Sequence, residues 1–320
     1  MIKKIFNKLA RVLYVHPPAP EYILSNAEIN QLFVNARKKI SDEINKNLTS
    51  PGLHGSKLSK EIGQGMDYSE SRLYSNGDDY RSINWKQSAR SDELIVNQYS
   101  KEQEPVDYIL LDNRPSMYFG SKTQTKISNA IKLVIESMVF SLARGHSLKV
   151  FGFNETIQYY GCIKDYKQAF KVVSVISEYH EKINTASVID ITKALQSIEN
   201  LKPENSNIAV ISDFNDMTEK ASHGLKIIKA TNFVSLYQVK DEIELKLPAI
   251  YPVDYQSLNS SKSTSIETLS GVNRFRQNIE IINKTILTLL MDSAHQLILV
   301  TNDTRKNLQV KNNEAKPDEF

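Results

Sequence analysis

Two acidic residues of this sequence directly follow apolar runs. Asp112 ends the run VDYILLD, and Asp213 comes after the run NIAVIS. Short apolar runs of this kind predict buried strands of a parallel sheet, and open α/β sheets bind ligands beyond the carboxyl ends of such strands. Two carboxylates that meet at this edge repel each other unless a cation lies between them. A divalent cation held by carboxylate and hydroxyl oxygens would meet this need, and Ser116 follows Asp112 by four positions.

Arg114 lies between Asp112 and Ser116, and it argues against a working metal site. Its guanidinium carries a permanent positive charge, which would repel Mg²⁺. The same group could form an ion pair with Asp112 or with Asp213. On these residues alone two possibilities stay open, a Mg²⁺ site and a pair of acids that Arg114 neutralises internally.

A regular alternation of strand and helix patterns from residue 105 to 304 must position these side chains. Periodic apolar residues predict helices at 126–144, around 165–180 and 188–200, and before the last strand. This order predicts an α/β fold with a mostly parallel sheet and helices on both faces. Residues 242–270 are expected to form a polar excursion or hairpin. After Thr301 the chain is polar and is expected to fray, with 305–320 as a polar tail. The predicted strands are 106–112, 148–153, 155–160 at an edge, 207–214, 233–239 and 296–300.

Residues 1–50 are expected to form an N-terminal helical segment with a proline-rich linker. The amphipathic pattern at 1–15 is interpreted as a terminal helix packed on its own domain, with peripheral membrane contact as the alternative. Ser25 and Glu28 have the spacing of a capping box, so we expect the next helix to begin there.

Residues 51–104 are expected to form a small β-rich module with closely specified turns. The pair Asn76-Gly77 is a strong hairpin signal, and the run ELIVNQYS predicts a strand. The stretch GDDYRSINWKQSAR places Lys86 and other charges around Trp85, the only tryptophan. One interpretation is a binding surface, because binding hot spots are rich in Trp and Arg. We favour the other, in which the acids cap turns and pair with arginines while Trp85 fills the join to the α/β domain.

Composition and motif content argue against several function classes. A net charge of +3 gives no concentrated basic face for nucleic acid, and a single cysteine excludes an intrachain disulfide and a Cys-based zinc site. The sequence has no metal-binding histidine spacing, no P-loop, no dinucleotide fingerprint and no serine-hydrolase elbow. The stretch FGSKTQTK, residues 119–126, is a weak anion-site candidate that we interpret as a solvated loop. We expect a non-catalytic cytoplasmic protein, with the inner face of the membrane as the alternative location.

The residues from about 50 to 304 resemble a bacterial family of domains of unknown function, the one numbered fifty-eight. Its members carry a von Willebrand factor A-like domain. The resemblance rests on many positions in register and on the strand end DNRPSM, with Asp213 and LILVTND further on. The other matching positions are Gly63, Gly65, Arg72, Tyr74, Gly77, Asp78, Asp79, Arg81, Ile83, Trp85, Ser88, Ala89, Arg90 and Glu104.

The resemblance implies which residues correspond to the metal-ion-dependent adhesion site of von Willebrand A domains. Asp112, Ser116 and Asp213 match ligand positions, whereas Arg114 stands for the first serine and Ile189 for the threonine. Two of the five ligand positions are thus lost. We expect a degenerate site with no metal and no other cofactor.

The resemblance also implies a role in protein assembly. Family members are commonly found beside MoxR-type AAA+ ATPases, so we expect an adaptor or partner of such an ATPase. The alternatives are a membrane-surface scaffold recruited by residues 1–15 and a Mg²⁺-dependent ligand binder of the von Willebrand A type.

Overall fold

The chain forms two compact units in the computed structural model, one of Met1–Pro51 with Pro105–Phe320 and the other of Gly52–Glu104. The residues that the structure describes are 23–49, 67–91, 93–100, 105–121, 124–178, 188–245, 253–256, 263–266, 269–302 and 304–308. Residues 1–15, Gly63, Gly65 and Glu104 lie outside them. In the described ranges, no helix is both long enough and apolar enough to cross a membrane.

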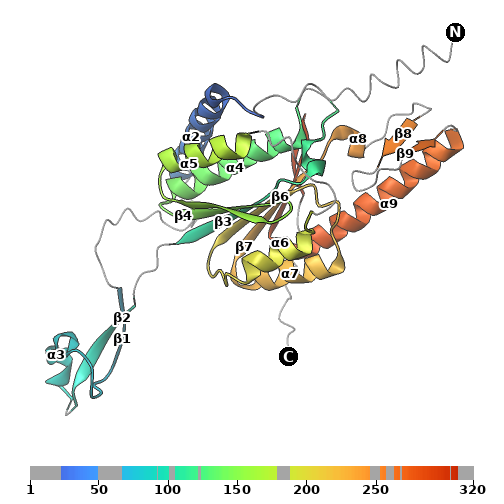
Figure 1. The fold of residues 1–320 in the computed structure, drawn as a ribbon. Coiled ribbons are helices and arrows are strands. Elements are labelled where there is room, and N and C mark those ends of the chain that lie inside the picture. The colour runs from blue at the N-terminus through green and yellow to red at the C-terminus, as the bar shows by residue number, and fades with distance from the viewer. Residues whose placement is uncertain are drawn as a thin grey trace, which may run out of the picture. The chain divides into compact units, whose positions relative to one another are not determined.

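The larger unit is built on a seven-stranded sheet of order β11-β10-β7-β6-β3-β4-β5 (Figure 1). The five central strands are parallel, and the edge strands β11 and β5 are antiparallel to their neighbours. This is the predicted α/β architecture, a mostly parallel sheet with helices on both faces. The strands are β3 (Val106–Asp112), β4 (Ser147–Phe153), β5 (Ile157–Ile163), β6 (Asn207–Ser212), β7 (Phe233–Val239), β10 (Gln296–Val300) and β11 (Arg305–Leu308).

Chain order reverses between β3 and β6 in this sheet. From β3 the chain continues outward through β4 and β5, whereas β6, β7 and β10 follow on the other side. The carboxyl ends of β3 and β6 therefore form the topological switch point, where doubly wound sheets bind their ligands.

Helices cover both faces of the sheet and bury an apolar core on each side (Figure 1). One face carries α2 (Asn26–Thr49), α4 (Lys126–Ala143) and α5 (Tyr166–Ser177), and the other carries α6 (Ile191–Glu199), α7 (Glu219–Thr231) and α9 (Leu269–Ser293). The strands between them are apolar on both sides, as burial on two faces requires.

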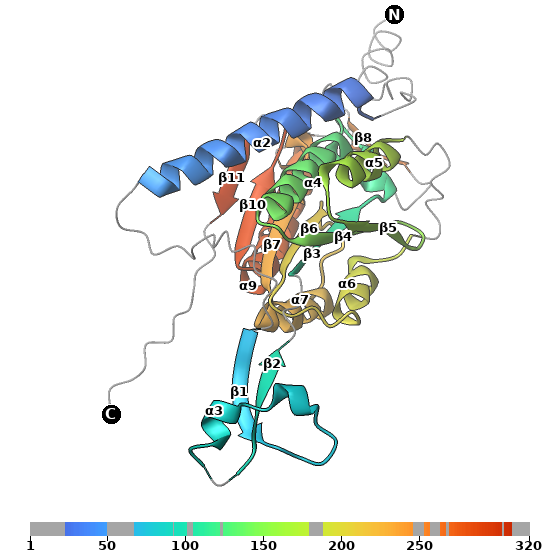
Figure 2. The same ribbon diagram turned by 90° about the vertical axis from the view of Figure 1, so that its left-hand side faces the viewer.

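The helix α2 belongs to the larger unit, because it lies across α4 and α5 (Figure 2). Its predicted capping box is confirmed: the amide of Ser25 donates to Glu28 Oε2 at 2.8 Å, and the amide of Glu28 to Ser25 Oγ at 3.3 Å. Ile29, Phe33 and Ala36 are buried on the side of α2 that packs on the unit. This spacing of three and four residues is the predicted amphipathic stripe.

Two predictions for the later part of the chain have different outcomes. Within the stretch 242–270, the described residues form α8 (Glu242–Leu245) and an antiparallel pair of strands, β8 (Val253–Gln256) and β9 (Ser263–Ile266), and the excursion as a whole stays a prediction. The prediction that the chain frays after Thr301 was wrong for Arg305–Leu308. These residues form the edge strand β11, because pairing with β10 satisfies the backbone groups of a polar segment that has no apolar pattern of its own.

The smaller unit contains a two-stranded antiparallel ribbon of β1 (Asp67–Leu73) and β2 (Ile95–Ser100). The run ELIVNQYS was correctly predicted as a strand. Asn76-Gly77 does not form a two-residue turn between β1 and β2. The connection between these strands is longer and also contains the short helices η1 (Tyr80–Ser82) and α3 (Trp85–Ser88). Gly77 has φ +115°, a conformation that favours glycine, and it makes a turn inside this connection.

Candidate functional site

Asp112 and Asp213 meet at the carboxyl edge of the sheet, as the sequence predicts. They follow the paired residues Leu111 and Ile211 of the neighbouring parallel strands β3 and β6. Both carboxylates are completely buried. Two buried acids at the switch point need cations close by, and the structure supplies these from its own side chains.

Arg114 binds one of these two acids together with a third. Its Nε and Nη2 donate to the two oxygens of Asp112 at 2.9 and 2.7 Å, and its Nη1 and Nη2 donate to Asp216 at 2.5 and 2.9 Å. The guanidinium carbon also lies 5.0 Å from the ring centroid of Phe153. Arg114 is only 7 % exposed, and it joins the ends of β3 and the loop after β6.

Burial and ion pairing have opposite effects on the pKa values of Asp112 and Arg114. Burial raises the pKa of the Asp112 carboxyl above its ordinary value, although Arg114 and the Ser212 hydroxyl, which donates to Asp112 at 2.6 Å, oppose this. Burial alone would lower the pKa of Arg114, but Asp112 and Asp216 raise it above its ordinary value. Arg114 is therefore a permanent cation, and two carboxylates share it.

Lys126 neutralises the other predicted acid. It is the first residue of α4 and is 2 % exposed, and its Nζ donates to Asp213 at 2.9 Å and to Glu244 at 2.8 Å. The interpretation of residues 119–126 as a solvated loop was wrong for Lys126. Its buried position depends on α4 starting beside β6, because Thr125 caps this helix and turns Lys126 toward the sheet edge.

A third cation, Lys240, lies at the end of β7 and donates to the side-chain oxygen of Asn215. Burial lowers the pKa of Lys240 below its ordinary value. Burial alone would raise the pKa of Asp213, but Lys126 and Lys240 lower it below its ordinary value. Asp213 is therefore held as a carboxylate by two lysines.

The other positions that correspond to metal ligands do not supply a ligand set. Ser116 lies in the short helix η2 (Pro115–Tyr118). Ile189 has an apolar side chain, and its amide donates to the Asn154 carbonyl at 2.8 Å. With a guanidinium at one ligand position, an isoleucine at another and an ammonium on Asp213, these residues do not fit a hard divalent cation. Across the described ranges, no three His, Cys, Asp or Glu side chains are grouped as potential metal ligands.

Serine, aspartate and histidine do come together at the opposite edge of the sheet. Asp107 accepts from Ser141 Oγ at 2.7 Å and from the Asn207 amide at 3.0 Å, and His146 Nδ1 lies 3.2 Å from both its oxygens. The serine and the histidine both bond the aspartate and not each other. A nucleophile must bond its base directly, so this cluster is a structural link among β3, α4 and β6.

The acids of the smaller unit bind to turns and to Arg72, whereas we find no side-chain ion pair of either acid with Arg81 or Arg90 among the described residues. Asp78 accepts from Arg72 Nη1 and Nη2 at 2.8 and 2.7 Å and from the Ser75 amide at 2.8 Å. Asp79 caps η1 by accepting from the Arg81 amide at 2.9 Å. These contacts fix the turns between β1 and β2.

The remaining residues of the motif are mostly on the surface. Trp85 is 65 % exposed and Tyr80 is 66 % exposed, so neither contributes to a buried core of this unit. That Trp85 fills a join between the units stays a prediction. Arg81, Lys86 and Arg90 are exposed as well, whereas Tyr74 is half-buried. Ser88 is structural, because its hydroxyl accepts from the Ile95 amide at 2.8 Å.

Four residues of the sheet-edge cluster were missed from the sequence: Asp216, Lys126, Lys240 and Glu244. Asp216 follows Asp213 by three positions, and this spacing could have indicated a second acid on the same loop. No local pattern marks the other three, because helix starts and strand ends often carry charges at the surface.

A family model and several known proteins are similar to this chain. A family model described as "Protein of unknown function DUF58" matches residues 70–285. "Uncharacterized protein Rv1480" of Mycobacterium tuberculosis is 30% identical over 107 residues, which are 33% of this chain and 32% of that protein. The chain thus matches about a third of this relative's length.

The solved structures that are similar to this chain include two bacterial proteins. The "conserved hypothetical protein BatB" of Bacteroides thetaiotaomicron is 14% identical with a TM-score of 0.36, and the match covers 57% of this chain and 99% of that one. A "von Willebrand factor type A" protein of Catenulispora acidiphila is 12% identical with a TM-score of 0.28, over 45% of this chain and 34% of that one.

Proposed function

The chain belongs to the family described as "Protein of unknown function DUF58", and we propose that it is a non-catalytic protein-interaction module that binds its partner without a bridging metal. The partner is a MoxR-type AAA+ ATPase, a class taken from the family resemblance. Its role is then that of an adaptor in protein assembly or remodelling.

One observation carries the metal-independent part of this proposal: Arg114 lies on Asp112 where a von Willebrand A domain needs a serine ligand. The guanidinium supplies the positive charge that a divalent cation would supply. Asp216 accepts hydrogen bonds from the other side of the guanidinium, so protein groups on both sides hold the Arg114 side chain in position. The sheet edge is thereby ordered before any partner arrives.

The cation pairs also support a non-catalytic role. Asp112 and Asp213 each accept hydrogen bonds from a buried cation, so neither is free to take a proton from a substrate. At the opposite edge, the bonds of Asp107 go to groups that hold the sheet together. The acids of the described sheet edges are therefore engaged in stabilising the fold.

The smaller unit offers a surface suited to protein binding. Tyr80 and Trp85 are large, rigid and exposed, and cationic side chains stand near them in the sequence. Aromatic residues and arginine dominate binding hot spots, because they bury a large area at low cost in conformational entropy. We assign the main partner contact to this surface.

The test is an affinity pull-down of the full-length chain from its own cells, with bound proteins identified by mass spectrometry. Trp85→Ala should lose most of the captured AAA+ ATPase, because it removes the anchor. Arg114→Ser should lose it only to the extent that the protein unfolds. Leu201→Ala is the matched control, since Leu201 is an exposed apolar residue of the other unit. Equal capture by wild type and Trp85→Ala, or no enrichment of an AAA+ ATPase, would overturn the proposal.

A further inference from the structure

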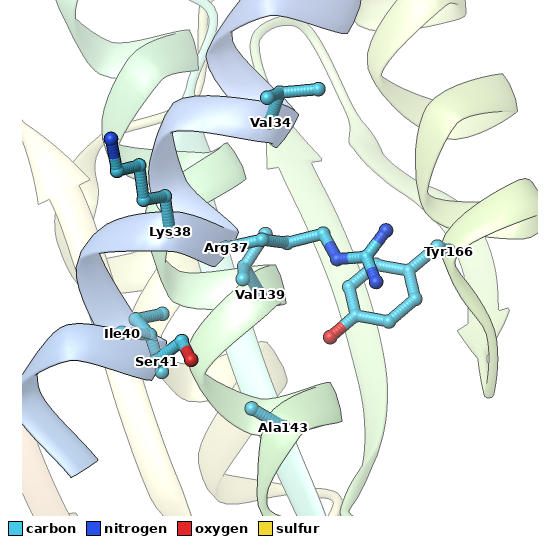
Figure 3. Close-up of a pocket in the computed structure, with 8 residues that line it drawn as sticks. All are labelled: Val34, Arg37, Lys38, Ile40, Ser41, Val139, Ala143 and Tyr166. Carbon is cyan, nitrogen blue, oxygen red and sulfur yellow. The ribbon is translucent and has the colours of Figure 1, made fainter. Parts of the chain in front are cut away.

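A hollow of about 460 Å³ lies among α2, α4 and α5 (Figure 3). Its apolar lining comes from Val34 and Ile40 of α2, Val139 and Ala143 of α4, and the ring of Tyr166 at the start of α5. This volume is within the usual range of ligand pockets, roughly 300–1,000 Å³. We call it the α2 groove. It lies away from the sheet-edge acids and in the other unit from Trp85.

The α2 groove lies where the packed face of α2 meets a second, exposed face: Ile40 packs against the core, whereas Val34 is on the exposed side. Ile29, Phe33 and Ala36 face the core, whereas Val34 is 60 % exposed. Val34, Arg37, Lys38 and Ser41 follow the spacing of three and four residues that places side chains on one helix face. Val34 is the apolar residue of this exposed face, and the described residues of α4 and α5 leave most of its surface uncovered.

Arg37 gives the groove its chemical selectivity. It extends from α2 to Tyr166, and its guanidinium carbon lies 4.7 Å from the centroid of the ring (Figure 3). Stacking fixes the plane of the guanidinium and leaves its N–H donors at the ring's edge. In the part of the chain that the structure describes, no carboxylate forms an ion pair with Arg37.

Asp165, which precedes Tyr166 in the sequence, does not pair with Arg37. Asp165 is the N-cap of α5, and its carboxylate accepts from the Gln168 amide at 2.8 Å. Lys38 adds a second cation at the rim of the groove. The groove therefore combines an apolar hollow with a guanidinium that stacks on Tyr166 and has no ion-pair partner among the described residues.

We propose that the α2 groove binds an acidic segment of a partner protein. A carboxylate of that segment pairs in a bidentate manner with Arg37, and a neighbouring apolar side chain enters the hollow beside Val139. Charge complementarity selects this occupant, because a neutral apolar peptide would leave Arg37 without an acceptor. The inference goes beyond the proposed function, because it depends on neither Trp85 nor the charged residues at the sheet edge.

The experiment begins with panning of a random dodecapeptide phage library on the full-length chain. Enriched peptides should carry Glu or Asp beside Leu, Ile or Phe. The strongest peptide is then synthesised with a fluorescein label, and its binding is followed by fluorescence anisotropy. Arg37→Gln should weaken binding about ten-fold or more, as expected for a lost charge-assisted pair.

Three controls make the result specific. Lys226→Gln removes an exposed charge from α7 on the opposite face of the sheet and should leave binding unchanged. Val34→Ser should weaken binding by removing part of the apolar lining. Equal melting temperatures of the variants would show that all of them fold.

Several outcomes would overturn the inference. Enriched peptides without acids, no enrichment at all, or equal binding by Arg37→Gln would each do so. Binding of phosphatidylserine vesicles that is lost in Arg37→Gln, with no peptide binding, would instead assign the groove to a membrane surface.

Discussion

The guanidinium of Arg114 spans the two carboxylates of Asp112 and Asp216, with Nη2 2.7 Å from one and 2.9 Å from the other. Asp112 ends β3, and Asp216 comes from the loop between β6 and α7. Asp216 also accepts from the Ile191 amide at 2.9 Å, at the first residue of α6. Arg114 and Asp216 together thus connect β3, the loop after β6 and the start of α6 at the switch point of the sheet.

Replacing Arg114 should strongly destabilise the larger unit. Arg114→Ser leaves Asp112 buried without its cation, and breaking a buried pair in this way costs about 3–5 kcal/mol. Urea unfolding followed by circular dichroism measures the change. Arg305→Ser is the matched control, because Arg305 forms an exposed ion pair with Glu136, and we expect a loss of about 1 kcal/mol or less. Similar losses for the two variants would contradict the structural role of Arg114.

Magnesium should not stabilise the protein in a saturable manner. The ligand positions hold Arg114 and Ile189, and neither offers an oxygen ligand from its side chain. Melting temperature is followed during titration with MgCl₂, with Ser116→Ala measured in parallel. A saturable rise in the wild type that is absent in Ser116→Ala would show a working metal site.

The ion pair of Asp213 with Lys126 should make the free energy of unfolding depend on pH in the acidic range. Its folded-state pKa is lowered, so it contributes stability that is fully present above the unfolded value of about 4 and is lost as pH falls below it. The free energy of unfolding should therefore differ most between wild type and Asp213→Asn near neutral pH, and the difference should shrink toward pH 3. Because Asp112 is shifted in the opposite direction, only the comparison with Asp213→Asn isolates this contribution. A constant difference from pH 7 to 3 would contradict it.

Replacing Lys126 should loosen the segment that contains α8. Lys126→Gln removes the charge that joins Asp213 to Glu244, and we expect a loss of about 3–5 kcal/mol in unfolding free energy. Hydrogen exchange should increase in Glu242–Leu245 more than in β5, which lies at the far edge of the sheet. Lys226→Gln serves again as an exposed control. Unchanged exchange in α8 would show that Glu244 does not depend on Lys126.

The sequence allowed most of the larger unit to be predicted, because strand and helix periods are local properties of the chain. The runs around β3, β6 and β7 and the capping box at Ser25 were correct for this reason. The edge strand β11 was missed because its residues are polar, and pairing with β10 determined its structure. The turn at Gly77 was identified, but local signals could not give the length of the connection around it.

The order of residues was enough to predict that Asp112 and Asp213 each follow a buried strand and that a cation stands two residues after Asp112. The contact between Arg114 and Asp112 follows from that short separation. The fold was needed to show that β3 and β6 are neighbours, that Asp216 holds the other side of Arg114 and that Lys126 binds Asp213. These partners are about a hundred positions apart in the chain, and the crossovers of a parallel sheet bring them together. Each pairing is needed because a buried charge without a partner would cost several kcal/mol in folding free energy.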